Sequence, residues 1–461
     1  MKKHTLGILL LAAACTAAPP DPYGPLPTPG QVRWQRMEMN MFCHFGPNTF
    51  SGAEWGSGVE PEDLFAPSSL DCRQWARTAA AAGFKGIIVT AKHHDGFCLW
   101  PNPESSHTVA RSGAPDVLRE LSAACREYGL GFGVYISPWD RNDPAYGSPE
   151  YNLKYARTLR SVLDGSYGPV FELWFDGACG EGPGGRRQEY DWPLFRSTVR
   201  SLQSGTIMFS DTGPGARWVG NEDGYAATTC WSTLDTAGFT PGAGAPPQDT
   251  LGRGNVHGRA WVPAEADVSI RPGWFWHAEE TPELKSAEAL FDIYLGSVGR
   301  NSLMLLNVPP DTLGRIDPAD SLRLMEFKAL RDSVFAVNLA AGARVRASAS
   351  RRGYGPRHLV AGNPDSYWAA PDGDLTPCLE LRLPMPATVG YVVLQEYIPL
   401  GQRVASFEVE VHSDGAWRHF ASGTTVGCKR ILTAPPVRAD RIRIRILSSL
   451  ASPVLSAVEV Y

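Results

Sequence analysis

Apolar and polar positions follow a regular pattern between about residues 31 and 336. Short apolar runs rich in β-branched residues alternate with longer amphipathic stretches, a pattern typical of βα units around a parallel sheet. The predicted strands are residues 38–45, 86–91, 131–137, 171–176, 206–210, 217–219, 261–265 and 302–307, and the predicted helices are 70–82, 115–128, 149–163, 192–202, 283–298 and 318–334. Eight strands with intervening helices predict an α/β fold of the (β/α)8 TIM-like barrel type.

A period-two alternation replaces this pattern after about residue 338. Residues 378–383, 407–411 and 441–446 alternate apolar with polar side chains and are separated by turns containing Pro, Gly and Asp. Such segments predict a small antiparallel β-sandwich. Their order resembles that of discoidin-like, galactose-binding sandwiches. We expect this domain to support the barrel, with sugar binding or calcium binding as the alternatives.

The N-terminal residues predict targeting rather than a folded element. Lys2 and Lys3 precede an apolar run at 6–14, which is shorter than the roughly 20 residues that a spanning helix needs. Residues 11–15, Leu-Ala-Ala-Ala-Cys, resemble a bacterial lipoprotein cleavage box in which Cys15 is lipidated, with simple cleavage as the alternative. We expect export to the periplasm or outer membrane of a bacterium, with the membrane contacted only through a lipid on Cys15.

These patterns divide the chain into three parts. Residues 1–30 are predicted to form the signal and a Pro-rich stem, 31–336 the barrel and 337–461 the sandwich. The sequence does not predict an oligomeric state.

The composition of the chain limits the classes of function that the protein can have. The net charge of −5 and the 20% share of charged residues argue against a nucleic-acid partner and against disorder. The eight cysteines after Cys15 show no CxxC spacing, so we expect mostly buried thiols. Neither zinc-ligand spacing nor a phosphate loop is present, and we expect no metal and no cofactor.

Aromatic residues make up 10% of the chain, including 14 tryptophans. Flat apolar rings suit sugars, whose C–H faces stack on them. Several of these rings fall at or near predicted strand ends and are candidates for a sugar pocket: Trp55, Trp100, Trp174, Trp218, Trp274 and Trp276.

Candidate chemistry also lies at the predicted strand ends, where barrel enzymes carry their active sites. The first strand ends near His44 and is followed by Glu54 and Trp55, while the second ends near His93 and His94. The third carries Tyr135, and the fourth ends in Trp174-Phe-Asp176-Gly. The imidazoles suit hydrogen bonds to hydroxyl groups, because neighbouring strand residues face opposite sides and would not share one metal ion.

Glycosidic cleavage commonly needs a second carboxyl group beside the first. The candidates beyond the fourth predicted strand are Asp211, Glu222, Asp223, Glu265 and Asp267. Glu222 follows Trp218, and an apolar neighbour raises the pKa of a carboxyl toward that of a general acid. Glu265 ends the predicted seventh strand, so position alone does not separate these two glutamates.

Together these motifs resemble the exported α-L-fucosidases of glycoside hydrolase family 29. The residues that carry the resemblance are His44-Phe-Gly, Glu54-Trp55, Lys92-His-His-Asp-Gly-Phe-Cys-Leu-Trp100-Pro and Trp174-Phe-Asp176-Gly. The resemblance implies that Asp176 is the nucleophile of a retaining reaction. It also implies a set of residues that hold fucose: His44, Glu54, Trp55, His93, His94, Tyr135 and Trp174.

The stretch Trp218-Val-Gly-Asn-Glu222 resembles the branch of that family that cleaves α-1,3 and α-1,4 fucose from branched glycans. This resemblance implies that Glu222 is the acid/base, with Glu265 second. Residues 263–277 resemble the same branch, so Trp274 or Trp276 is expected to wall the pocket. The implied substrate is a fucosylated oligosaccharide of Lewis type. The alternatives are a retaining glycosidase for another sugar, such as a galactoside, and a non-catalytic sugar-binding surface protein.

Overall fold

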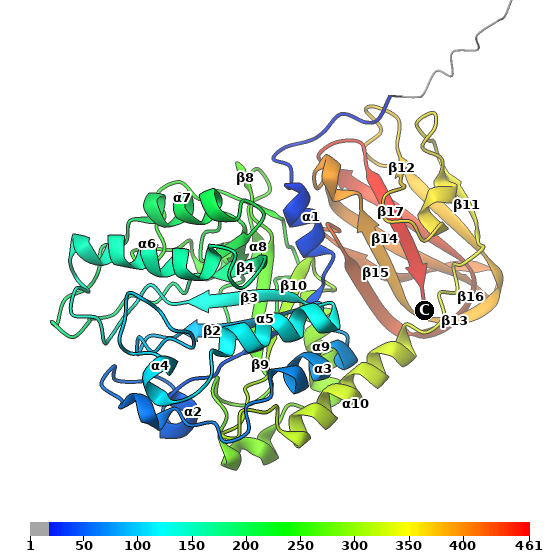
Figure 1. Cartoon of the computed structure of the whole chain (residues 1–461). Helices are drawn as coiled ribbons and strands as arrows, with labels where there is room; N and C mark the ends of the chain where they lie inside the picture. The colour runs from blue at the N-terminus through cyan, green and yellow to red at the C-terminus, as the bar shows by residue number, and fades with distance from the viewer. Residues whose placement is uncertain (1–17) are drawn as a thin grey trace, which may run out of the picture.

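The computed structural model describes residues 18–461, and Figure 1 shows two domains packed against each other. The predicted signal segment and Cys15 lie outside the described residues. The first domain is a closed barrel surrounded by helices, and the second, coloured orange to red for most of its length, is an antiparallel sheet domain. In residues 18–461, no helix has both the length and the apolar content needed to cross a bilayer.

Eight parallel strands close the barrel in the order β1-β10-β9-β6-β5-β4-β3-β2, which confirms the predicted fold class. They are β1 (Met39–Cys43), β2 (Gly86–Lys92), β3 (Gly131–Ile136), β4 (Val170–Trp174), β5 (Ile207–Ser210), β6 (Ala216–Trp218), β9 (Ala264–Ser269) and β10 (Ser302–Asn307). All seven residues of β2 are buried. A strand covered on both faces reads as a continuous apolar run, which is why these strands could be predicted.

Most of the long helices begin at an aspartate that caps them. Asp71, Asp116, Asp191 and Asp317 each accept a hydrogen bond from a backbone N–H of the first turn, which satisfies a donor that the helix itself leaves free. The α-helices are α1 (Pro29–Gln35), α2 (Asn48–Ser51), α3 (Cys72–Ala82), α4 (Val109–Ser112), α5 (Val117–Tyr128), α6 (Pro149–Leu163), α7 (Trp192–Leu202), α8 (Gln248–Arg253), α9 (Ala287–Ser297) and α10 (Pro318–Val334). The 3-10 helices are η1 (Glu62–Leu64), η2 (Ala278–Glu283), η3 (Pro356–Val360) and η4 (Ile398–Leu400).

The seventh barrel strand differs from its prediction at residues 261–265. Residues Ala260–Trp261 form β8, which pairs antiparallel with β7 (Thr233–Leu234) outside the barrel. Pro263 has no N–H to donate to a ladder and separates β8 from β9. The barrel strand therefore begins at Ala264, and Glu265 is its second residue rather than its end.

The C-terminal domain is an antiparallel sheet structure with its own apolar core. Leu379 and Leu381 alternate with half-buried or exposed residues and pair with Ile444 and Ile442, as the period-two pattern predicts. The strands are β11 (Arg344–Ala347), β12 (Trp368–Ala369), β13 (Cys378–Glu396), β14 (Val404–Ser413), β15 (Ala416–Gly423), β16 (Arg430–Ser449) and β17 (Val454–Val460). Register shifts mark irregularities along the two longest strands, β13 and β16.

The sheet domain contacts the barrel at the end where the barrel strands begin. Lys429 forms an ion pair with Glu38, which immediately precedes β1. The backbone N–H of Cys428 donates to Oδ1 of Asn301, directly before β10, at 2.7 Å. Cys230 N–H donates to Thr425 Oγ1 at 2.9 Å. These contacts place the second domain against the N-terminal end of the barrel, away from the C-terminal strand ends.

The eight cysteines of the described chain are all unpaired. Five of them, Cys43, Cys72, Cys98, Cys125 and Cys230, are buried, as expected for thiols that act as small apolar side chains.

Two glutamates face each other inside the barrel. The indole N–H of Trp34 donates to Glu172 Oε2 at 2.7 Å, and that of Trp174 donates to Glu265 Oε2 at 3.2 Å. Burial raises the pKa of Glu172 to about 7, and burial together with Glu172 raises the pKa of Glu265 well above its usual range. The pair therefore holds protons in an apolar interior that disfavours charge.

We expect Glu265→Gln to change the pH dependence of stability. The folded-state pKa of these acids exceeds the unfolded value, so the stability they supply is complete below about pH 4.5, and the part supplied by Glu172 is lost as the pH rises through about 7. The wild-type melting temperature should fall between pH 5 and 8 more steeply than that of Glu265→Gln. Parallel curves would show that the pair does not titrate in this range. Glu127→Gln at the surface is the control.

Candidate active site

One cavity of about 160 Å³ lies at the C-terminal ends of the barrel strands. Ten of the residues that the sequence and the family resemblance select for the site line this cavity: His44, Glu54, Trp55, His93, His94, Tyr135, Trp174, Asp176, Glu222 and Trp274. Phe42, Ala178 and Asp267 complete the lining. The barrel therefore brings together motifs that lie more than 200 residues apart in the sequence.

Asp176 follows β4 and is held by donors on both carboxylate oxygens. The Tyr135 hydroxyl donates to Oδ2 at 2.9 Å, and the backbone N–H of Ala178 donates to Oδ1 at 2.6 Å. Nε2 of His94 lies 3.9 Å from Oδ2. A side chain at residue 177 would collide with the carboxylate of Asp211, so Gly177 lets the chain turn directly after Asp176. Burial and the charge of Asp176 raise the pKa of Asp211 to about 6.

Three histidines line the cavity in neutral form. Burial lowers the pKa of His44 to about 3 and that of His94 to about 4, and it lowers the pKa of His93 as well. Nδ1 of His44 lies 2.9 Å from Asn307 Oδ1, and Nδ1 of His94 lies 2.8 Å from Ser137 Oγ. A neutral imidazole has one donor and one acceptor nitrogen, which suits hydroxyl groups. No group of three or more His, Cys, Asp or Glu residues in the described chain is arranged to hold a metal ion.

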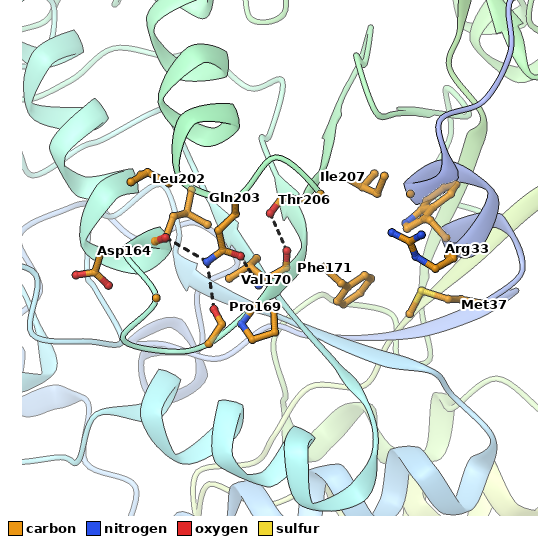
Figure 2. Close-up of a pocket in the computed structure, with 16 residues that line it drawn as sticks. Arg33, Met37, Asp164, Pro169, Val170, Phe171, Leu202, Gln203, Thr206 and Ile207 are labelled. Carbon is orange, nitrogen blue, oxygen red and sulfur yellow. Dashed lines mark hydrogen bonds between the residues drawn. The ribbon is translucent and has the colours of Figure 1, made fainter.

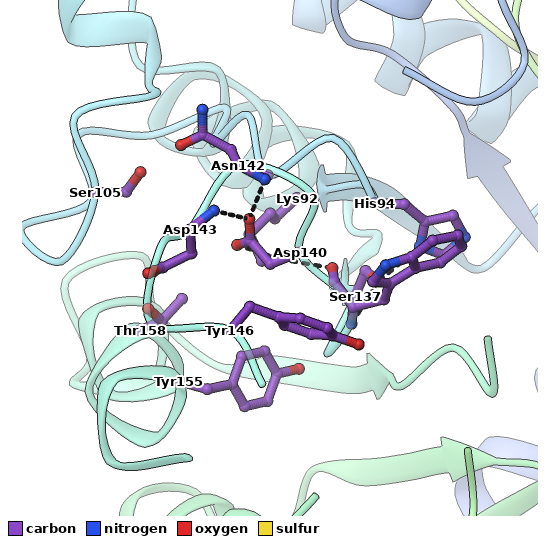
Figure 3. Close-up of polar contacts among 12 residues, drawn as sticks. Lys92, His94, Ser105, Ser137, Asp140, Asn142, Asp143, Tyr146, Tyr155 and Thr158 are labelled. Carbon is purple, nitrogen blue, oxygen red and sulfur yellow. Dashed lines mark hydrogen bonds and ion pairs between the residues drawn. The ribbon is translucent and has the colours of Figure 1, made fainter. Parts of the chain in front are cut away.

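A buried ion pair fixes the loop behind His94, and Figure 3 shows its polar contacts. Nζ of Lys92 donates to Asp140 Oδ2 at 3.0 Å and to the carbonyl oxygen of Trp139 at 3.1 Å. The other Asp140 oxygen accepts the backbone N–H groups of Asn142 and Asp143 at 2.9 and 2.8 Å. Because the loop is held in this way, the Trp139 ring packs on His94 with 4.7 Å between ring centroids.

Glu54 joins two loops at the wall of the cavity. Its Oε2 accepts the backbone N–H of Trp274 at 2.8 Å, and its Oε1 lies 3.1 Å from His277 Nε2 and accepts the N–H of Phe275 at 3.3 Å. Trp274 is thereby held with its ring along the cavity. Trp276 instead donates to Asp317 Oδ2 at 3.2 Å and does not line the cavity. The structure therefore identifies Trp274, and not Trp276, as the tryptophan that lines the cavity, whereas the sequence left both as candidates.

Glu222 lies at the mouth of the cavity on the loop that follows β6. Its Oε2 accepts the indole N–H of Trp274 at 3.2 Å. Partial burial raises the pKa of Glu222, the Trp274 hydrogen bond opposes that rise, and the charges of Asp176 and Asp223 add to it. The carboxyl group is therefore biased toward its protonated form beside an ionisable partner, as a general acid requires.

Several aromatic and carboxyl residues that the sequence offers as candidates for the site lie outside the cavity. Trp100 is buried and donates to Ser161 Oγ at 3.0 Å, and Trp218 donates to Asp267 Oδ1 at 2.9 Å. Neither ring lines the cavity. Glu265 was predicted at a strand end, but it is fully buried below Trp174 in the barrel interior. The later start of β9 removes the positional argument for Glu265 as the acid/base.

A larger cavity of about 630 Å³ lies at the opposite end of the barrel, where β4 and β5 begin. Arg33 and Asp164 are the charged side chains among its described lining residues, and Phe171 and Ile207 supply apolar surface (Figure 2). Its Gln203 side chain donates to the carbonyl oxygens of Leu163 and Gly168 at 3.1 Å each, so these polar groups stabilise the fold locally. The carboxyl and imidazole groups selected from the sequence lie at the other end, which is where barrel enzymes carry out chemistry.

Fold and site together define a class of enzyme. The C-terminal face of the barrel presents carboxyl groups beside neutral histidines and aromatic rings, in a cavity smaller than those that bind drug-sized molecules. Paired carboxyl groups and aromatic walls around a space for one small ring are typical of glycoside hydrolases.

Comparison with known proteins identifies the family. Residues 27–329 match the family described as Alpha-L-fucosidase, and residues 344–460 match the F5/8 type C domain. Alpha-L-fucosidase 1 of Arabidopsis thaliana is 41% identical over 96% of this chain and 88% of its own length. A Ruminococcus gnavus GH29 fucosidase solved in complex with fucose is 32% identical, with a TM-score of 0.88 over 97% of this chain and 96% of that one. The chain belongs to the alpha-L-fucosidase family of glycoside hydrolases.

We expect Glu54→Gln to weaken substrate binding more than it weakens the fold. The amide has one acceptor oxygen where the carboxylate has two, so the loop carrying Trp274 loses a charge-assisted hydrogen bond of about 1.5–3 kcal/mol. The KM for 4-nitrophenyl α-L-fucoside should rise about tenfold. Glu60→Gln on the same loop is the matched control, because Glu60 accepts hydrogen bonds only from Ser57 and Gly58 among the described residues. An equal rise of KM in both variants would contradict this role.

Proposed function

We propose that the protein releases terminal α-L-fucosyl residues in two displacement steps with retention of the anomeric configuration. In this proposal Asp176 is the nucleophile and Glu222 is the acid/base. The observation that carries it is that both carboxyl groups line the same cavity, Asp176 beside Tyr135 and Glu222 beside Trp274.

In the first step an Asp176 oxygen attacks the anomeric carbon, and the bond to the departing glycosidic oxygen breaks. Hydrogen bonds from Tyr135 and Ala178 hold the carboxylate in one orientation before the attack. Orientation of this kind lowers the entropic part of a barrier. Glu222 gives its proton to the departing oxygen, and its raised pKa keeps that proton available. In retaining enzymes the two carboxyl groups lie about 5–5.5 Å apart.

The second step reverses the role of Glu222. Once Asp176 is esterified its negative charge is gone, and the contribution of that charge to the raised pKa of Glu222 disappears. Glu222 then holds its proton less tightly, and the indole N–H of Trp274 stabilises its carboxylate. The carboxylate takes a proton from the water that attacks the anomeric carbon, and fucose leaves as the retained anomer.

The neutral histidines support recognition of the sugar hydroxyl groups. His44 and His94 each use one ring nitrogen on Asn307 or Ser137, which leaves Nε2 of each ring for the substrate. A substrate that lacked the matching hydroxyl would leave a buried polar group unpaired, and that penalty supplies specificity.

We also propose α-1,3 and α-1,4 fucosyl linkages in Lewis-type glycans as the substrates. The support is the stretch Trp218-Val-Gly-Asn-Glu222, which resembles that branch of the family and which carries Glu222 to the mouth of the cavity.

Carboxyl replacements test the mechanism on Lewis a trisaccharide. Asp176→Ala should lower kcat/KM at least about 10³-fold, and Glu222→Ala about 10²- to 10⁴-fold. Proton NMR should show α-L-fucose as the first-formed anomer. Undiminished turnover by Asp176→Ala, or the β-anomer as first product, would contradict the mechanism. Asp63→Ala at the surface is the control. If the wild-type protein cleaved 2′-fucosyllactose well and did not cleave the Lewis glycan, the proposed linkage preference would be wrong, but the mechanism would not be affected.

Trp274→Phe tests the electrostatic role of the indole. Loss of its N–H removes a hydrogen bond that favours the charged form of Glu222, so the pKa of Glu222 should rise further. A general acid works only when protonated, and the alkaline limb of the kcat/KM profile should therefore move to higher pH. Trp276→Phe is matched, because its indole donates to Asp317 outside the cavity and should leave the limb in place. Equal shifts in both variants would argue against this contact.

A further inference from the structure

Besides Asp176, Glu222 and Glu54, a fourth carboxyl group faces the cavity, and the two-carboxyl mechanism does not use it. Asp267 lies on β9 two residues after Glu265, so both point into the barrel. Asp267 is 3% exposed and lines the cavity together with Asp176 and Glu222. Asp267 is therefore a buried acid in the proposed substrate cavity, and it has no role in the two displacement steps.

The contacts of Asp267 leave one oxygen free. Oδ1 accepts the indole N–H of Trp218 at 2.9 Å. Oδ2 accepts no hydrogen bond from any other residue of the described chain, and no Lys, Arg or His in residues 18–461 forms an ion pair with Asp267. An ionised, unpaired carboxylate at this depth would be costly, so the group is stable here in its protonated form.

The charged and titratable groups around Asp267 act in the same direction. Burial and then the charge of Glu222 raise its pKa, its own backbone N–H and then the Trp218 indole lower it, and the charge of Asp176 adds a smaller rise. Glu265, the next inward residue on β9, is itself an acid with a raised pKa. Since Trp218 occupies Oδ1, the proton of a neutral Asp267 belongs on Oδ2, where it is a hydrogen-bond donor.

We propose that Asp267 is a specificity-determining residue that donates a hydrogen bond from its neutral carboxyl group to one ring hydroxyl of the bound fucosyl unit. The proposal rests on the proposed function, because it takes the cavity to be the fucose-binding site. In this proposal Asp267 is a hydrogen-bond donor that keeps its proton, whereas Glu222 gives its proton to the departing oxygen.

Two replacements separate a neutral donor from an ionised carboxylate. Asp267→Asn keeps a neutral donor and an acceptor, and kcat/KM should stay within about threefold of wild type. Asp267→Leu has no donor and should lose about ten- to thirtyfold, as expected for one hydrogen bond to substrate. If Asp267→Asn lost as much as Asp267→Leu, the donor would not be a neutral group and the proposal would fail.

The pH profile gives a second readout. A neutral Asp267 adds no charge beside Glu222, so Asp267→Asn should leave the alkaline limb of kcat/KM unchanged. Asp223→Asn is the matched variant, because Asp223 raises the pKa of Glu222 and its removal should move that limb to lower pH. A shift in Asp267→Asn as large as that in Asp223→Asn would show that Asp267 is ionised and would overturn the proposal.

Binding measurements keep this test independent of the catalytic proposal. We expect calorimetric titration of L-fucose and its 2-, 3- and 4-deoxy analogues to identify one hydroxyl whose removal weakens binding to wild type but not to Asp267→Leu. If every analogue lost the same affinity in both proteins, Asp267 would not touch the sugar. Thermal unfolding checks the fold of each variant, and Asp267→Asn keeps the proposal testable if Asp267→Leu does not fold. If the proposed catalytic roles of Asp176 and Glu222 were wrong, their alanine variants would keep their turnover. That result would leave these binding differences unchanged.

Discussion

Closure of the barrel is the constraint on which the site depends. Met41 of β1 pairs with Leu306 of β10 on one side and with Ile87 of β2 on the other, so no strand has a free edge. All eight strands run parallel, and their last residues therefore meet at one face. Alternate residues of a strand point inward, so a slip of one residue in β9 would move Asp267 from the cavity to the outside of the barrel.

The cavity concentrates carboxyl groups without a cation to neutralise them. In the described chain no Lys or Arg pairs with Asp176, Glu222 or Asp267, and burial removes the positive charge of the three histidines. The site lowers its net charge by holding protons, which is why burial raises the pKa of both Glu222 and Asp267. In the mechanism that we propose, this arrangement lets one carboxylate serve as a nucleophile while another acid keeps the proton it must deliver.

Sequence patterns predict the fold and most of the cavity because both depend on local signals. Buried strands read as apolar runs, and residues such as His44 and Asp176 follow them within two residues. The errors arise where tertiary contacts decide. Pro263 divides an apolar run into a hairpin strand and a barrel strand, which moved Glu265 into the interior. The choice between Trp274 and Trp276 depends on Glu54, a residue some 220 positions away, and no spacing rule encodes that contact.

The second domain lies at the opposite end of the barrel from the cavity, and this position limits its role in substrate specificity. Its contacts with Glu38 and Asn301 lie where β1 and β10 begin, whereas the cavity lies where the barrel strands end. A sugar bound by this domain would sit apart from Asp176 and could not choose the linkage that is cleaved. Under the proposed function, discrimination between linkages therefore falls to the barrel loops, which the Glu54, Trp274 and Glu222 contacts join at the mouth of the cavity.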